Sequence, residues 1–281
     1  MAAFYLLGLN HHINRKMQTF ISKDGTGIAC DILGKGHALI LVGGALSTHA
    51  DHAKLAERLA PEFTIYNYDR RGRGESGDAN HYTVQREVED IDALIGEIGG
   101  SAYVYGISSG ACLALEAGAA LGDRILKLAI YEAPYDEALG KAEEWRTFSD
   151  ELNKLLAADR RSDAVALHMQ IVGLSEEDIT RMKATPIWKK MEMLAHTLAY
   201  DAAVLGPDRS IPVQRITTVK AHTLVMDGGA SLDPMPFMRP TADKIYRRLP
   251  NGRRLTVDGQ SHHIDEKKLA PILVEFFGRS H

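Results

Sequence analysis

The feature that most constrains the fold of this chain is a repeated alternation between short apolar runs and longer amphipathic stretches. Residues 37–42 (HALILV) form a continuous apolar run, and residues 83–99 (TVQREVEDIDALIGEIG) carry the apolar spacing of a helix. Continuous apolar runs are typical of strands buried on both faces of a parallel sheet, and such strands are joined by helical crossovers. We therefore predict an α/β fold, with helices on both faces of one mostly parallel sheet.

Further runs along the chain continue this pattern and predict a single domain over residues 17–281. Residues 18–22 and 27–33 flank a KDGT turn and are predicted to form an opening hairpin. Later strands are predicted at 63–69, 102–107, 125–133, 222–229 and 255–259, with a closing helix at 269–277. Residues 1–16 show no clear periodicity, so we treat them as an N-terminal extension, with disorder as one interpretation.

Strand signals stop between Pro134 and about Pro212, where the sequence shows helical periodicity with long polar faces. This stretch is too short to be assigned as an independent domain. We predict a helical insertion over about 134–212 that forms a lid on the strand ends.

Composition limits the partners of the chain. It has 33 basic and 37 acidic residues, for a net charge of -4, and no basic excess to bind phosphates or an anionic membrane. We therefore expect a small-molecule substrate, with no nucleic acid and no membrane as partner, and leave a homodimer open. Cys30 and Cys112 are too few for a disulfide framework and lie in apolar stretches, which favours buried thiols and a cytoplasmic location.

A Gly-x-Ser-x-Gly pattern at residues 106–110 lies between a predicted strand and an Ala-rich helix. In a nucleophile elbow, a sharp strand-to-helix turn of this kind presents a serine oxygen above the sheet, here that of Ser108. The small flanking residues let the turn form without clashes. The backbone N–H of Ser109 is then aimed at a carbonyl oxygen that becomes negative, and Ala45, after the strand at 37–42, is the predicted second oxyanion donor.

The general base is expected after the last strand, where the GQSHHID segment supplies His262 and His263. Adjacent side chains point in different directions, so only one of them can face Ser108. We assign the role to His262 and keep His263 as the alternative.

The carboxylate that orients the histidine has three candidates. The usual acidic position after the strand at 222–229 is occupied by Ser231, with Asp227 and Asp233 on either side. Glu132, at the end of the strand at 125–133, lies on the same predicted edge of the sheet as the serine. We favour Glu132 over both aspartates.

Two other motifs do not support a cofactor or a metal. Residues 72–77 (GRGESG) have the letters of a dinucleotide-binding motif, but the next clear helix begins near Thr83 instead of inside the motif. His49 and His52 lack the further ligands that a zinc site needs. We read the turn at 69–72 as a charged loop in which Asp69 bonds backbone N–H groups.

Together, the elbow, the YDRRGRGES turn, the helical insertion and the GQSH segment resemble the α/β-hydrolase superfamily from Met17 onward. The resemblance implies an eight-stranded sheet, a Ser-acid-His triad and hydrolysis of a carboxylic ester through an acyl-enzyme. An acid at Glu132 and a Ser-Ser-Gly elbow are similar to the zearalenone-type lactonases, which adds lactones to the expected substrates. The chain departs from the common pattern in lacking a His-Gly after the third strand and an acid at Ser231.

Because a fold does not fix a function, three alternatives stay open. The same triad could transfer an acyl group to an alcohol or thiol, or carry out cofactor-free oxidation or perhydrolysis. A non-catalytic ligand-binding protein of this fold is the third.

Overall fold

One eight-stranded sheet organises the chain in the computed structural model, which describes residues 15–230 and 235–279. Its strands are β1 (Arg15–Ile21), β2 (Gly27–Gly34), β3 (His37–Val42), β4 (Phe63–Tyr68), β5 (Ala102–Ile107), β6 (Ile125–Tyr131), β7 (His222–Gly228) and β8 (Gly252–Val257). They lie in the order β1-β2-β4-β3-β5-β6-β7-β8. Only β1–β2 and β2–β4 pair antiparallel, and all other neighbours are parallel. The predicted α/β fold with an eight-stranded, mostly parallel sheet is confirmed.

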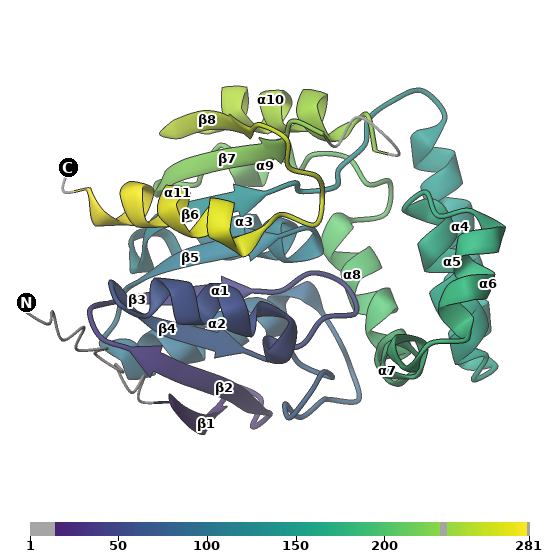
Figure 1. Ribbon diagram of the computed structural model, residues 1–281, viewed down its shortest axis with the longest axis horizontal. Helices are drawn as coiled ribbons and strands as arrows, with labels where there is room; N and C mark the ends of the chain where they lie inside the picture. Colours follow the sequence, from purple (N-terminus) through teal and green to yellow (C-terminus); the bar gives the residue numbers. More distant parts are fainter. Residues whose placement is uncertain (1–14, 231–234, 280–281) are drawn as a thin grey trace, which may run out of the picture.

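Helices cover both faces of the sheet (Figure 1). One face carries α1 (Ala53–Leu59), preceded by a short 3-10 turn, and α11 (Glu266–Gly278). The other carries α2 (Val84–Ile98), α3 (Ser109–Leu121), α9 (Val213–Ile216) and α10 (Met238–Arg248). Alternate residues of the central strands enter the two hydrophobic clusters, as with Val104 on the α3 face and Tyr105 on the α1 face.

Local sequence signals place several elements as expected. The opening hairpin forms, with Gln18 opposite Cys30, although β1 begins at Arg15, three residues before the predicted strand at 18–22. The Thr83 side chain caps α2 by accepting a hydrogen bond from Arg86 N. Both cysteines are free and buried.

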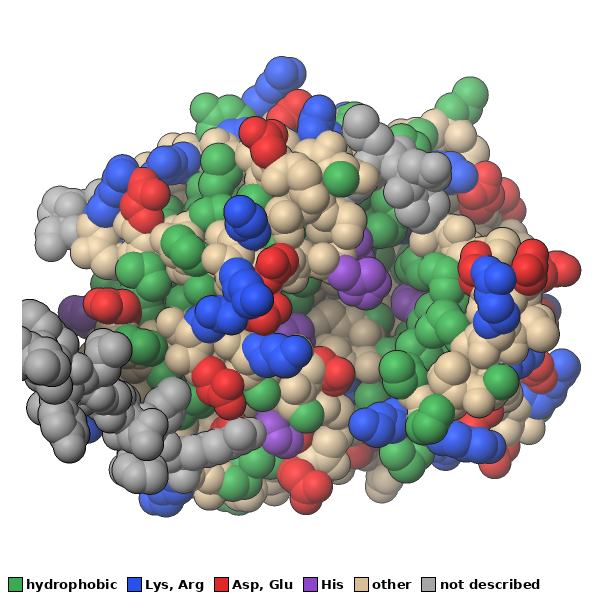
Figure 2. Space-filling model, viewed as in Figure 1, with side chains coloured by type: hydrophobic (Ala, Val, Ile, Leu, Met, Phe, Trp, Pro, Cys, Tyr) green, Lys and Arg blue, Asp and Glu red, His purple; other side chains and the backbone are tan. Residues whose placement is uncertain are grey.

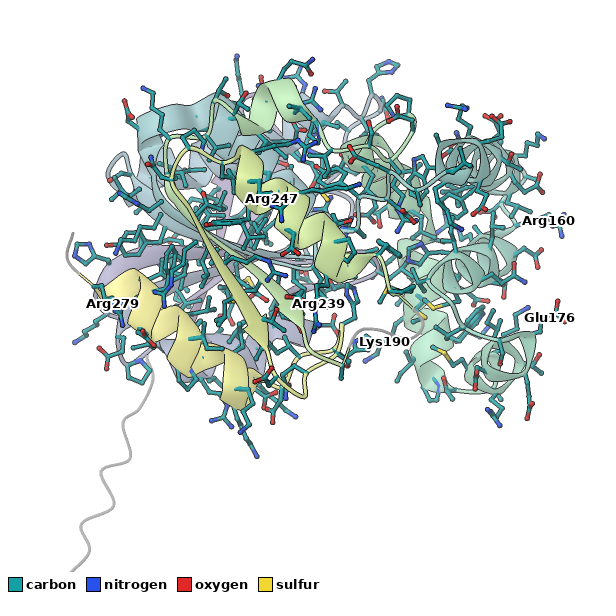
Figure 3. All side chains as sticks on the ribbon, turned by 90° about the horizontal axis from the view of Figure 1, so that it is seen from above. Arg160, Glu176, Lys190, Arg239, Arg247 and Arg279 are labelled. Atoms are coloured by element: carbon teal, nitrogen blue, oxygen red, sulfur yellow. The ribbon has the colours of Figure 1, made fainter. Side chains whose placement is uncertain are left out.

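A helical insertion leaves the sheet after β6 and returns before β7. It contains α4 (Lys141–Ala157), α5 (Arg161–Ile171), α6 (Glu176–Lys183), α7 (Pro186–Leu194) and α8 (Leu198–Leu205). Part of it has its own small apolar cluster, centred on Trp188 and Val165, while α8 packs on α3 of the main body. Arg160 and Glu176 lie on the side of the insertion that faces away from the sheet (Figure 3). Its action as a lid stays a prediction.

None of the helices within residues 15–230 and 235–279 combines the length and the apolar character needed to cross a lipid bilayer.

Candidate active site

Ser108 lies at the sharp turn between β5 and α3, with a backbone φ of 56° and ψ of -129°. A non-glycine residue with positive φ is strained, and the surroundings must hold it there. The Ser108 N–H donates to the carbonyl of Tyr131 in β6 at 3.0 Å. The sequence motif therefore forms an elbow, anchored to the neighbouring strand.

The two glycines of the motif are required by close backbone contacts. A Cβ on Gly106 would lie 2.4 Å from the carbonyl oxygen of Gly110. A Cβ on Gly110 would lie 2.3 Å from the carbonyl oxygen of Val42 and 2.4 Å from that of Gly43. The first turn of α3 thus rests directly on the end of β3.

The loop after β3 reaches the serine. A Cβ on Gly44 would lie 3.0 Å from Ser108 Cβ and 3.7 Å from its Oγ. The next peptide N–H, that of Ala45, makes no hydrogen bond to any described residue. Leu46 follows with a φ of 53°, so the loop bends sharply at this point. The predicted oxyanion donors Ala45 and Ser109 directly follow Gly44 and Ser108, the two residues that make this contact.

Glu132 and His262 are brought together by the sheet edge and the loop after β8. Glu132 Oε2 lies 2.7 Å from His262 Nδ1, and Glu132 Oε1 accepts a hydrogen bond from the Gly228 N–H at 2.8 Å. The Glu132 side chain is fully buried, and its backbone is also strained, with a φ of 50°. The Tyr131 hydroxyl donates to the carbonyl of Ser261 at 2.6 Å, which holds the histidine loop against β6.

The His262 ring makes its hydrogen bond to Glu132 and none to Ser108 in this structure. Hydrogen bonds of this kind are often long before substrate binds and tighten in the complex. The His263 ring lies at 71° to that of His262, with the centroids 6.0 Å apart. Burial lowers the pKa of His263, and the neighbouring His262 lowers it further.

Asp227 has different partners. This buried carboxylate binds Arg254 Nη2 at 2.6 Å and Arg239 Nε at 3.1 Å, and it accepts a hydrogen bond from the Thr256 hydroxyl. Figure 3 shows Arg239 on α10, beside β8. Asp227 therefore joins β7, β8 and α10. The other aspartate considered, Asp233, lies outside the described residues.

The turn after β4 is built around the buried carboxylate of Asp69. Asp69 accepts hydrogen bonds from the N–H groups of His49 and Glu75, as predicted. A Cβ on Gly74 would lie 2.1 Å from an Asp69 carboxylate oxygen, so the glycine lets this turn wrap around the carboxylate.

Among the described residues, no cluster of His, Cys, Asp and Glu has the size needed to hold a metal ion.

Sequence reasoning missed a buried ionic network that starts at this turn. Arg70, Arg71 and Arg73 are almost completely buried. Arg70 binds both oxygens of Glu87 at 2.7 Å, and Arg70 and Arg73 each donate to Asp201 Oδ1 at 2.8 Å. Three arginines directly after a predicted buried strand are a signal that could have indicated this network, because arginines buried there require acidic partners.

One histidine of the insertion also lies near the site. Burial lowers the pKa of His168, in α5, to about 4; the charges on Arg73 and His262 lower it further, whereas the charge on Asp201 opposes the shift. The ring is therefore neutral at neutral pH. Figure 2 shows the surface hollowed between the main body and the insertion, with histidine side chains in the hollow and hydrophobic ones on the insertion side.

Comparison with known proteins defines the family. The profile of the alpha/beta hydrolase family matches residues 39–270, which is most of the chain. An alpha/beta hydrolase from Sphaerobacter thermophilus has a similar structure, with 46% identity and a TM-score of 0.83, over 92% of this chain and all of that chain. This chain therefore belongs to the alpha/beta hydrolase family.

Other similar proteins are also hydrolases. N-formylmaleamate deformylase from Pseudomonas putida is 38% identical over 104 residues, which is 36% of this chain and 39% of that protein. The uncharacterized hydrolase YraK from Bacillus subtilis is 34% identical over 33% of this chain and 35% of its own length. An esterase from Thermogutta terrifontis shares the fold, with 19% identity and a TM-score of 0.71, over 94% of this chain and 98% of that one.

Gly110→Ala should destabilise the protein strongly, because its Cβ would meet two backbone carbonyls that cannot move aside. Overpacking of this kind typically costs about 1–3 kcal/mol, sometimes more. Gly96→Ala in α2, where the nearest atom is a flexible Arg124 side chain 3.8 Å away, is the matched control and should be neutral or stabilising. Urea unfolding of both variants measures the difference, and equal stabilities would contradict the close contact at Gly110.

Proposed function

We propose that this protein is a serine hydrolase that cleaves a carboxylic ester or lactone through an acyl-enzyme on Ser108. The observation that carries the proposal is the 2.7 Å contact between His262 Nδ1 and Glu132. Glu132 follows β6 at the same edge of the sheet at which the strained turn at Ser108 follows β5. A carboxylate bound to Nδ1 keeps that nitrogen protonated and leaves Nε2 as the base.

In the proposed reaction, His262 Nε2 accepts the Ser108 proton while Ser108 Oγ attacks the substrate carbonyl. The N–H groups of Ala45 and Ser109 stabilise the oxyanion, and His262 then returns the proton to the leaving alcohol. Water, activated by the same histidine, releases the acid and restores Ser108. Glu132 stabilises the imidazolium in both halves of the reaction.

The choice of Glu132 as the acid is supported by the different surroundings of Asp227. Two arginines and a threonine bind the Asp227 carboxylate. In Glu132, by contrast, one carboxylate oxygen binds the histidine and the other accepts a hydrogen bond from the Gly228 N–H. A carboxylate fixed in this way holds the imidazole in one orientation.

The partial match to a deformylase supports a second substrate class, the N-formyl group, on the same residues. Formyl transfer from nitrogen to water uses the same nucleophile, base and oxyanion donors. Parallel assays of aryl esters, simple lactones and N-formyl compounds separate these classes. Assays with an added alcohol or with peroxide separate hydrolysis from acyl transfer and perhydrolysis.

Ser108→Ala should reduce turnover of short aryl esters to background, a loss of about 10⁴-fold or more, because no acyl-enzyme can form. Its circular dichroism and melting curve should match those of the wild type. Labelling by a fluorophosphonate, mapped by mass spectrometry, should locate to Ser108 in the wild type. A folded variant that still turns over substrate would refute the proposal, and a wild type that takes no label would favour a non-catalytic protein.

Glu132→Gln should lower kcat by about 10²- to 10⁴-fold, because the amide disturbs the tautomer and the charge stabilisation of His262. Asp227→Asn is the matched control: it removes a charge of equal burial that does not touch the histidine. We expect that control to lower the melting temperature and to change kcat less than threefold. If Asp227→Asn lowers kcat more than Glu132→Gln does, the triad acid is Asp227 instead of Glu132.

A further inference from the structure

The carbonyl oxygen of Gly44 accepts two side-chain hydrogen bonds. Arg73 Nη1 donates to it at 2.5 Å and Ser47 Oγ at 2.8 Å. The preceding carbonyl, that of Gly43, accepts from Arg70 Nη1 at 3.2 Å. The backbone between β3 and the bend at Leu46 is therefore held by two buried guanidiniums and a serine hydroxyl.

This carbonyl belongs to the same peptide group as the Ala45 N–H. A peptide group is planar, and in its trans form the C=O and the N–H point in opposite directions. Bonds that fix the Gly44 carbonyl toward Arg73 and Ser47 therefore aim the Ala45 N–H the other way. A charged donor on the carbonyl also polarises the group and makes its N–H a stronger donor.

Asp201 holds the arginine in place. Its Oδ1 accepts hydrogen bonds from Arg73 Nη2 at 2.8 Å, from Arg70 Nη1 at 2.8 Å and from the Ser109 hydroxyl at 2.7 Å. Burial alone would raise the pKa of Asp201, but Arg73, Arg70 and Ser109 outweigh it and bring the pKa to about 2. The carboxylate is therefore ionised at neutral pH.

Asp201 comes from α8, so this contact ties the helical insertion to the loop after β3 and to the residue that follows the nucleophile. We propose that Arg73 is a positioning residue, which orients and polarises the Gly44–Ala45 peptide as an oxyanion donor, and that Asp201 of the insertion sets the place of Arg73. This inference rests on the proposed function, since it needs an oxyanion at Ser108.

Arg71 provides a matched control within the same turn. Its side chain is as buried as that of Arg73, with 0% exposed for each. It binds both oxygens of Asp90, at 2.6 and 2.8 Å, and Asp24 at 3.0 Å. It makes no hydrogen bond to the loop after β3. Arg71→Gln therefore breaks buried ion pairs without touching the candidate oxyanion donor.

Arg73→Gln should lower kcat by about 10- to 100-fold, somewhat less than the loss of a whole oxyanion donor, with KM changed less than threefold. Inhibition by an aryl boronic acid, which forms a tetrahedral adduct with an active serine, should weaken by the same factor as kcat/KM. Ser47→Ala should show a smaller loss, because the hydroxyl is a neutral donor. Arg73→Lys should recover part of the activity. Arg71→Gln should lower the melting temperature but keep kcat.

If Arg73→Gln does not fold, the double variant Arg73→Gln with Asp201→Asn also neutralises the buried carboxylate that has lost one of its two arginines, and it carries the same expectation. A folded Arg73 variant with kcat/KM within threefold of wild type would overturn the inference, as would an equal loss of kcat in Arg71→Gln or unchanged boronic acid inhibition. Ser108→Ala run alongside separates the two proposals. If Ser108→Ala still turns over substrate, the serine mechanism itself is wrong. If Ser108→Ala is inactive but Arg73→Gln has normal activity, only the proposed role of the guanidinium is wrong.

Discussion

Backbone-to-backbone contact between the first turn of α3 and the end of β3 is the constraint on which the site depends. At Gly110 there is no room for even one additional carbon, because the carbonyls of Val42 and Gly43 already occupy that space. The contact brings Gly44 against Ser108 and fixes the elbow relative to the neighbouring loop. The strained backbone of Ser108 persists because this packing and the bond to Tyr131 leave it no alternative.

Charge burial is the second organising feature. Arg70, Arg71 and Arg73 leave water on folding, and each loses hydration that only close, well-oriented acids can replace. Glu87, Asp90 and Asp201 supply that replacement from α2 and α8. Because the acids come from different elements, the network fixes how these helices sit over the ends of β3 and β4. Such a network favours one arrangement over others, even where its net contribution to stability is small.

Much of the fold could be predicted from the sequence because its signals are local. The apolar run at 37–42 indicated a buried central strand, and Thr83 indicated the start of α2; both were confirmed. The glycines around Ser108 predicted an elbow because few other residues permit that turn. Glu132 could be placed near the histidine because parallel strands end on one edge, and the structure brings the two side chains together.

The partnership of Arg73 with Asp201 could not be predicted in the same way. The two residues are 128 positions apart, and the orientation of the helical insertion is set by tertiary packing instead of local periodicity. The start of β1 at Arg15 was missed because Arg15 and Lys16 lack the apolar pattern of a strand, while the pairing with Leu33 and Ile32 places them in one.

The origin of Asp201 in α8 has a consequence for the evolution and engineering of this scaffold. The insertion between β6 and β7 enters and leaves the sheet at one place and has the form of a self-contained module. Here, however, the module contributes a carboxylate to the interior of the host domain. A transplanted insertion of a different design would leave two arginines without their shared counter-ion. A successful chimera must therefore bring its own acid to this position or exchange the arginines together with the helices.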